Sequence, residues 1–468
     1  MSETFTFSRR GALAGLAATL LPLGVAAQDS RPTASPSAQP IMLRALPTTR
    51  KLVPEGSEEA DLWLFEGPGP VPVIRVKLGD EVFARLVNDT PSPLSLHWQG
   101  LRGPNAMDGV AGLTQPAVAP GASFDYRFRP PDSGVILIRP MVPGAAAEAS
   151  GRGLAGLLVV EEREPPKVAA DHALVLRDWR LEPSGGLSPF GAPMEAAIAG
   201  RLGNRLSLDG QDPPRRIEAP AGSQIRLRLA NASNARTLRI RFDDMKVFVA
   251  GVDGQPTDRF EPLRASLPFA PGTRYDLLLE LGADAGATGK IVAVVGNGVP
   301  LVEIAATAPA PGTAPVALTN VPLNPLLPPE IRLQNALRKD IAISGGATRS
   351  ASGEPAFTGD PRAIWKLNGA AGSAGGPPLF TAKRGQPVVL ALHNQTGFPQ
   401  PIHLHGHVCR LLHPLDDGWE PYWLDTLQVA EGRTARIAFI ADNPGKWAIG
   451  SSVLERFDTG LWGWFEVT

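Results

Sequence analysis

The sequence of 468 residues predicts an all-β protein built from three tandem Greek-key β-sandwich domains. Two short motifs, each present three times and in the same order, are the main reason for this prediction. The 50 glycines and 48 prolines support it, because abundant turn formers are typical of short strands joined by many turns rather than of long helices.

The first motif is a glycine turn that opens a strand and is followed nine positions later by asparagine, at Gly79–Asn88, Gly222–Asn231 and Gly385–Asn394. Apolar and variable residues alternate within it, as expected of a half-buried strand. The second motif is a turn ending in glycine that precedes another alternating strand. Its copies and their strands are 118–121 with 123–129, 269–272 with 274–280, and 429–432 with 434–440.

Copies of these motifs lie about 150 residues apart, which suits a sandwich domain and is too long for a solenoid repeat. The repeats predict domains at residues 41–165, 166–308 and 363–468. A proline-dense run followed by a Gly/Ser/Ala-rich stretch predicts an interdomain linker over 309–362.

The N-terminus predicts export. Ser8-Arg9-Arg10 precedes an apolar stretch, and the small-residue pattern Val25-Ala26-Ala27 follows, so residues 1–27 are interpreted as a twin-arginine signal peptide directing the protein to the periplasm. A short membrane anchor is the alternative, but the stretch is too short to span a bilayer. Residues 28–40 are polar and proline-rich and are expected to form a disordered leader.

Charge and cysteine content narrow the classes of protein. The chain has 45 basic and 46 acidic residues, which argues against a general nucleic-acid binder. No apolar run is long enough to span a membrane in the mature chain. Cys409 is the single cysteine, so no internal disulfide can form. We expect a monomer that interacts with a periplasmic protein partner.

Four of the seven histidines lie close together in the sequence, at His393, His403, His405 and His407. His403 and His405 are two residues apart, so on a strand they point the same way and can act as a metal claw. His97 stands alone beside Trp98. A lone histidine is more often a packing residue than a ligand, and both interpretations remain open for it.

Six stretches resemble the multicopper oxidases, and they follow the family's order along nearly the whole mature chain: 97–115, 118–128, 153–160, 226–236, 401–407 and 460–467. The resemblance implies three cupredoxin-like domains. It also allows the family's copper-binding motifs to be laid on this sequence residue by residue.

The resemblance implies that the type 1 copper site is lost, because its positions hold Gln400, Ser451, Arg456 and Leu461 in place of the family's ligands. A serine hydroxyl cannot replace the soft cysteine thiolate through which substrate electrons enter. Five of the six type 3 positions are also lost, at Gln99, Arg139, Met141, Gly450 and Ser452. Four-electron reduction of oxygen by the family's mechanism is therefore excluded.

Three of the family's ligand positions survive: His97 and His403 of the type 2 site, and His405 of the type 3 site. They predict a residual site for one copper ion, with Met141 as an additional soft ligand. The alternative is that they persist as hydrogen-bonded packing and bind no metal. Arg139 favours the alternative, because a nearby guanidinium repels a metal ion.

Two classes of function follow. The first is a non-enzymatic binding or scaffold protein of the periplasm, related to the cell envelope or cell division. The superfamily includes a copper-free, twin-arginine-exported protein of bacterial cell division, to which this chain is similar in fold, signal and loss of ligands. The second is a copper-binding protein or an atypical oxidoreductase with a mononuclear copper site.

Overall fold

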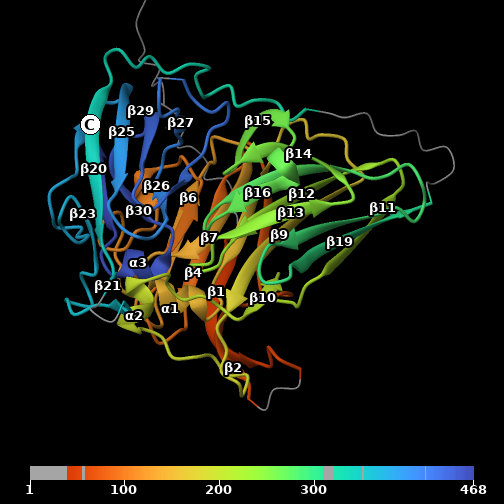
Figure 1. The fold of residues 1–468 in the computed structure, drawn as a ribbon, viewed down its shortest axis with the longest axis horizontal. Coiled ribbons are helices and arrows are strands. Elements are labelled where there is room, and N and C mark those ends of the chain that lie inside the picture. Colours follow the sequence, from red (N-terminus) through yellow and green to blue (C-terminus); the bar gives the residue numbers. More distant parts are fainter. Residues whose placement is uncertain (1–38, 55–57, 309–319, 350–352, 417) are drawn as a thin grey trace, which may run out of the picture. The chain divides into compact units, whose positions relative to one another are not determined.

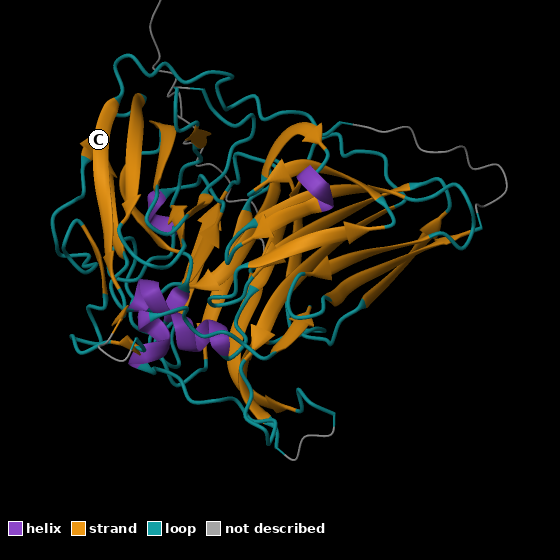
Figure 2. Ribbon diagram, in the orientation of Figure 1, coloured by secondary structure: helices purple, strands orange, loops and turns teal. Residues whose placement is uncertain are grey.

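A computed structural model describes residues 39–54, 58–308, 320–349, 353–416 and 418–468. Strands dominate this part of the chain and the helices are few and short, which confirms the all-β prediction (Figures 1 and 2). The predicted signal peptide and nearly all of the predicted leader lie outside the described residues. The described residues form no helix with the length and hydropathy of a membrane span.

The N-terminal third forms two four-stranded sheets, ordered β2-β1-β4-β6 and β3-β8-β7-β5. Their strands are β1 Ile41–Arg50, β2 Ala60–Phe65, β3 Val73–Lys77, β4 Val82–Asn88, β5 Leu96–Gln99, β6 Ser123–Phe128, β7 Gly134–Pro140 and β8 Gly156–Glu161. Buried side chains from both sheets, including Leu86, Trp98 and Ile138, form one apolar cluster between them. This is the core of a β-sandwich.

The middle third also forms two sheets, ordered β10-β9-β12-β17-β14-β15 and β11-β19-β18-β13-β16. Their strands are β9 Ala170–Trp179, β10 Arg205–Leu208, β11 Arg215–Pro220, β12 Gln224–Asn231, β13 Leu238–Asp243, β14 Lys246–Val252, β15 Gln255–Phe260, β16 Ser266–Phe269, β17 Arg274–Glu280, β18 Thr288–Ala293 and β19 Val299–Thr307. β13 shows the alternation of a half-buried strand, because Leu238, Ile240 and Phe242 are buried while Arg239 and Arg241 face solvent.

The C-terminal third forms the sheets β23-β20-β25-β29-β27 and β24-β31-β30-β26-β28, with a small β21-β22 pair. Its strands are β20 Leu337–Gly345, β21 Thr348–Arg349, β22 Pro355–Ala356, β23 Trp365–Leu367, β24 Thr381–Ala382, β25 Gln386–Asn394, β26 Gln400–Leu404, β27 Arg410–Leu412, β28 Thr426–Val429, β29 Thr434–Ala441, β30 Gly445–Ser451 and β31 Trp462–Val467. Five short helices complete the described elements: α1 Ala146–Gly151, α2 Pro193–Ala197, α3 Leu454–Asp458, η1 Asn105–Met107 and η2 Leu263–Ala265.

The two sequence motifs mark neighbouring strands in each third of the chain. The strand of the first motif pairs antiparallel with the strand of the second motif, as β4 with β6, β12 with β17 and β25 with β29. The strand of the first motif also pairs parallel with the strand that comes first in sequence in the same sheet, as β4 with β1, β12 with β9 and β25 with β20. The three sheets thus repeat one arrangement, in agreement with the predicted repeat.

The asparagine that ends each copy of the first motif forms hydrogen bonds to the backbone of the second motif. Asn231 is fully buried; its Nδ2 donates to the carbonyls of Arg236 and Phe269, at 3.0 and 2.9 Å, and its Oδ1 accepts from the Ser233 N–H at 3.0 Å. Asn88 and Asn394 make the same pattern of bonds in their own domains. One side chain therefore satisfies buried backbone groups of two turns.

Changing Asn231 to alanine is expected to lower the free energy of unfolding by about 2–4 kcal/mol, because three buried backbone groups lose their partner. Chemical denaturation of the variant and of the wild type measures this difference. The exposed Asn297 provides a matched control. If Asn231→Ala lowered the free energy of unfolding no more than Asn297→Ala does, the hydrogen bonds of Asn231 would not stabilise the fold as proposed.

The predicted linker over 309–362 does not hold for residues 337–345. These residues form β20, which pairs parallel with β25 and antiparallel with β23 and so belongs to a sheet of the third domain. Residues 338–340 of this strand are charged and exposed, and Ile341 and Ile343 are its two buried residues. The sequence did not predict this strand, because only two apolar residues alternate in it and small residues follow from residue 343 onward.

A buried ion-pair network joins the first domain to the second. Glu162, next to the end of β8, accepts two hydrogen bonds from Arg226 on β12, at 2.7 and 2.9 Å. Arg226 also binds Asp276 on β17, and the neighbouring Arg228 binds Asp171. Arg226 and Arg228 are 1% exposed, so the paired carboxylates are what makes their burial tolerable.

Replacing Glu162 with glutamine is expected to cost about 1–3 kcal/mol of stability at neutral pH and little in acid. Burial acts to raise the pKa of Glu162, but the hydrogen bonds and charges of Arg226 and Arg228 outweigh it and lower the pKa. A lowered pKa gives stability that is complete above the unfolded-state value of about 4.5 and is lost as pH falls through the folded-state value. Thermal unfolding between about pH 3 and pH 7 checks this. A wild-type advantage that does not shrink in acid would contradict it.

Candidate metal centre

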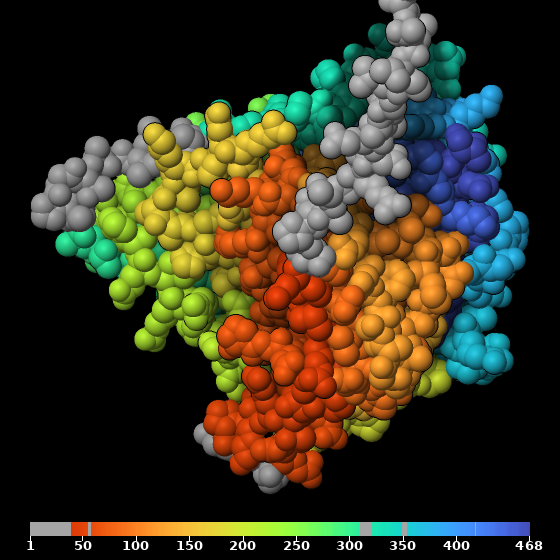
Figure 3. Space-filling model, turned by 180° about the vertical axis from the view of Figure 1, so that it is seen from behind, coloured from red at the N-terminus to blue at the C-terminus, as the bar shows by residue number. Residues whose placement is uncertain are grey.

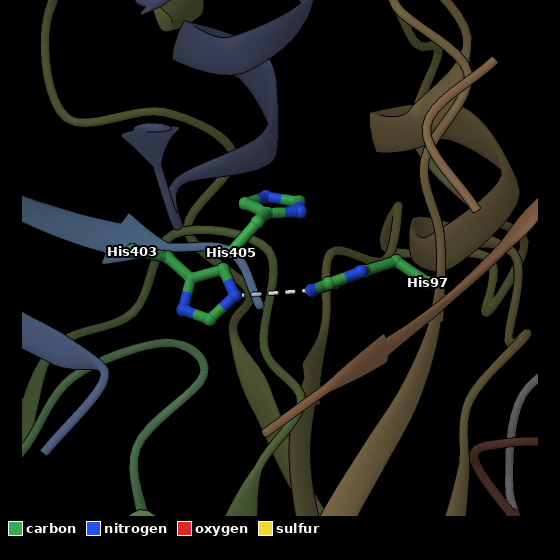
Figure 4. Close-up of side chains that lie close together, drawn as sticks. All are labelled: His97, His403 and His405. Atoms are coloured by element: carbon green, nitrogen blue, oxygen red, sulfur yellow. Dashed lines mark hydrogen bonds between the residues drawn. The ribbon is translucent and has the colours of Figure 1, made fainter. Parts of the chain in front are cut away.

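Three histidines from the first and third domains meet in the interior. His97 lies on β5, His403 lies on β26, and His405 follows the end of β26 (Figure 4). Their side chains are at most 4% exposed. The Nε2 atoms of His97 and His403 are 3.0 Å apart, and one ring nitrogen from each of the three lies within 4.8 Å of the others. The predicted residues are therefore brought together.

The strands that carry His97 and His403 occupy different places in their sheets. β5 is the edge strand of its sheet, whereas β26 lies inside its own sheet between β30 and β28. Seen from behind, the surface of the first domain (orange) adjoins that of the C-terminal third (blue), as Figure 3 shows. His403 and His405 lie side by side with ring centroids 4.6 Å apart, as the two-residue spacing predicts.

A second layer of residues holds each imidazole by its Nδ1 atom. His97 Nδ1 donates to the Asp108 carbonyl at 2.7 Å, and His405 Nδ1 lies 3.0 Å from the Asp108 carboxylate. His403 Nδ1 lies 3.1 Å from the Asp425 carbonyl and 3.2 Å from its carboxylate. Since these partners are acceptors, the protons of the neutral rings sit on Nδ1. This carboxylate–histidine pattern is the one that orients metal ligands in proteins.

The arrangement leaves the Nε2 lone pairs facing one another. At 3.0 Å the Nε2 atoms of His97 and His403 repel unless a cation lies between them, either an extra proton or a metal ion. Burial is the main cause that lowers the pKa of His403, and burial together with the charge of His97 lowers that of His405 to about 3. Burial thus disfavours an extra proton on His403 and on His405, and the three imidazole nitrogens form a donor set that fits a single metal ion.

Asp108 and Asp425 are site residues that the sequence reasoning missed. Both are almost fully buried. Burial acts to raise their pKa, but His405 and His97 outweigh it at Asp108, and Arg274 and His403 outweigh it at Asp425, so both pKa values lie well below the ordinary range. The available signal for Asp108 was its place inside the matching stretch 97–115.

Arg274 joins all three domains behind the histidines. Its guanidinium donates to the Val135 carbonyl of the first domain, to the Gly272 and Asp253 carbonyls of the second, and to both carboxylate oxygens of Asp425 in the third. The Asp253 carboxylate accepts the backbone N–H of Asp425. This network fixes the segment that holds His403 Nδ1.

The positions that the resemblance assigns to type 1 copper ligands now bind one another. Arg456 Nη1 donates to Gln400 Oε1 at 2.7 Å, and it also donates to the Pro399 carbonyl. Ser451 Oγ accepts the Val453 N–H, and Leu461 is fully buried. These residues offer neither thiolate nor imidazole, and one of them carries a buried guanidinium. They do not fit a type 1 copper ion.

The former type 3 positions are filled by a second guanidinium. Arg139 lies opposite His97 on the neighbouring strand β7, and its side chain donates to Gln99 Oε1 at 3.2 Å and to the Ser452 carbonyl at 3.3 Å. It therefore points toward two other positions that the resemblance assigns to type 3 copper ligands, Gln99 and Ser452. Met141, the expected soft ligand, packs in an apolar cluster with Ala448 and Leu454. A pair of type 3 coppers does not fit this set.

His393, His407 and Cys409 add no ligand to the centre. His393 bonds Thr434 and Asp340 at the surface, and His407 packs among aromatic rings with Nδ1 on the His405 carbonyl. Cys409 is buried with Sγ near the Leu424 carbonyl, as expected of a small core residue. Of the described His, Cys, Asp and Glu residues, one group of three, His97 with His403 and His405, has the geometry to hold a metal ion.

Fold and site together define a three-domain cupredoxin-type protein with a histidine centre between its first and third domains. Sequence models of the multicopper oxidases match residues 48–165, 178–296 and 349–468. The solved structure of a multi-copper oxidase from Pseudomonas thermotolerans superposes with a TM-score of 0.79 and 30% identity, covering 92% of this chain and 99% of that chain. The chain belongs to the multicopper oxidase family.

Two curated relatives show the breadth of that family. The multicopper oxidase MmcO of Mycobacterium tuberculosis is 27% identical over 504 aligned residues, covering 95% of this chain and 93% of the relative. The cell division protein FtsP of Proteus mirabilis is 31% identical over 248 residues, covering 48% of each chain. The chain is thus similar both to oxidases of the family and to a cell division protein.

Proposed function

We propose that this protein is exported to the periplasm and acts there as a binding or scaffold protein of the cell envelope, not as a four-copper oxidase. The observation that carries the proposal is the hydrogen bond from Arg456 to Gln400. It joins two positions that the resemblance assigns to type 1 copper ligands, and one of them carries a positive charge. Arg139 supports it in the same way at the type 3 positions. An oxidase of this family needs both sites, and one buried guanidinium opposes copper binding at each of them.

A role related to cell division is the finer part of the proposal. The similarity to the cell division protein FtsP supports it, and so does a fold that keeps its three domains after losing its copper ligands. A scaffold requires a stable surface and a protein partner, and it tolerates loss of the electron-transfer ligands.

The first test is oxygen consumption by the copper-loaded protein with a phenolic substrate and with Cu(I), beside a four-copper relative as control. We expect no turnover above that of free copper. Sustained reduction of oxygen to water by this chain would overturn the proposal.

A second test uses the cells that produce the protein. Deletion of its gene should cause an envelope or division defect, and a gene encoding His97→Ala with His403→Ala should restore the normal phenotype as well as the wild type does. This result is expected of a scaffold, because its function does not depend on the histidine centre. Failure of the double variant, with the protein present at normal amounts, would favour a function that depends on the histidine centre.

A single bound copper ion is the second candidate function, and the geometry of His97, His403 and His405 favours it. Their Nδ1 atoms are held from behind and their Nε2 atoms face one space. A copper ion there would supply one-electron chemistry. The chain's residues would orient the imidazoles, and burial would exclude bulk water.

A further inference from the structure

Arg139 is a buried cation without a contacting carboxylate. It is 2% exposed, and its described hydrogen-bond partners are the neutral Gln99 Oε1 and Ser452 carbonyl. Its Nε–H has no partner among the described residues. A buried donor left in this way costs about 1–3 kcal/mol, and more when it is charged.

Carboxylates act on Arg139 only from a distance. Glu455 and Asp458 favour its charge, but Glu455 accepts a bond from Asn234, and Asp458 accepts the backbone N–H groups at the start of α1. The charge of Arg274 acts against it. Burial, the main cause, lowers the pKa of Arg139 to about 10, so the guanidinium is still charged at neutral pH.

The hydroxyls of Ser452 and Ser95 are also buried without a partner among the described residues. Ser452 Oγ belongs to the residue whose carbonyl Arg139 contacts. Ser95 lies two residues before His97 on the same chain segment, and Ser95 O accepts the Met141 N–H. By the pleat of paired strands, Ser95 and His97 share a face with Arg139 and Met141.

The neutral neighbours cannot satisfy these donors. Gln99 Nε2 donates to Thr426 and to the Gly272 carbonyl, and its Oε1 accepts from Arg139 Nη1 and not from Nε. Gly272 closes the other side. A Cβ there would lie 2.3 Å from Gln99 Nε2 and 2.8 Å from Ser452 Oγ. A charged N–H and nearby hydroxyls, without a contacting carboxylate, form the donor set that recognises an anion.

We infer that the site formed by Arg139 and Ser452 binds a small monovalent inorganic anion of the halide class. The anion would accept the free Nε–H of Arg139 and the serine hydroxyl, and its charge would compensate the buried guanidinium. Because the site uses none of the histidine nitrogens, the anion can bind when no metal is present.

Thermal unfolding of chelator-treated, metal-free protein tests this inference. Chloride is raised at constant ionic strength against gluconate, an anion too large for a buried site. We expect the melting temperature of the wild type to rise with chloride and to saturate, as binding to the folded state alone requires. Arg139→Met should abolish this dependence, whereas Arg129→Met, at an arginine that is 64% exposed, should keep it.

Bromide-soaked crystals of the wild type give a second measurement that does not depend on the variant folding. An anomalous peak within hydrogen-bonding distance of Arg139 would support the site. Absence of both the peak and the chloride dependence would overturn it and leave water as the occupant. Because the protein is metal-free throughout, these outcomes are separate from those of the copper experiments.

Discussion

Changing His97 and His403 together to alanine is expected to remove the copper that the wild-type protein retains after loading and desalting. The two residues supply the facing Nε2 atoms, 3.0 Å apart, and His405 alone cannot hold an ion against the charge of Arg139. Since loss of an outer partner of a metal ligand already costs about 10–100-fold in affinity, loss of two ligands should weaken binding at least ~100-fold.

Elemental analysis measures this effect as about one copper ion per wild-type chain and none in the double variant. The matched control is His172→Ala with His393→Ala: His172 lies on β9 of the second domain and His393 at the surface of the third, so both imidazoles are away from the centre. Copper that survives the His97/His403 change, or a wild type that retains none, would contradict the single-ion site and leave the histidines as packing residues.

Changing Asp425 to alanine is expected to lower the free energy of unfolding by about 3–5 kcal/mol. The variant removes the nearest charged partner of the Arg274 guanidinium, which is 0% exposed, and leaves only the Asp253 carboxylate, 3.9 Å away. It also removes an acceptor of His403 Nδ1. Arg274 bonds to all three domains, so the loss should appear as reduced stability of the whole assembly in chemical denaturation.

Two further variants separate this effect from general sensitivity to mutation. Arg274→Met combined with Asp425→Leu removes both charges and should recover much of the lost stability, because a buried ion pair is often replaceable by apolar residues. Asp243→Ala breaks the exposed pair with Arg241 and should cost less than about 1 kcal/mol. Equal losses in Asp243→Ala and Asp425→Ala would contradict the proposed role of the buried pair.

The sequence by itself determined the fold and the chemistry that is absent. The two repeated motifs predicted three β-sandwiches, because strand alternation and glycine turns are local properties of the chain. The resemblance to the multicopper oxidases implied that Gln400, Ser451 and Arg456 stand at type 1 ligand positions, and their residue types offer neither a thiolate nor an imidazole. The spacing of His403 and His405 placed their rings side by side.

Tertiary structure alone decided how the remaining residues meet. His97 and His403 are 306 residues apart in sequence, and only the packing of β5 against the third domain brings their Nε2 atoms together. The direction of Arg139 and the contact of Asp425 with Arg274 depended on the same packing. β20 was missed because its pairing with β25 stabilises a strand with only two buried anchors. Contacts between distant segments follow from how whole sheets bury their faces, which no local pattern of residues records.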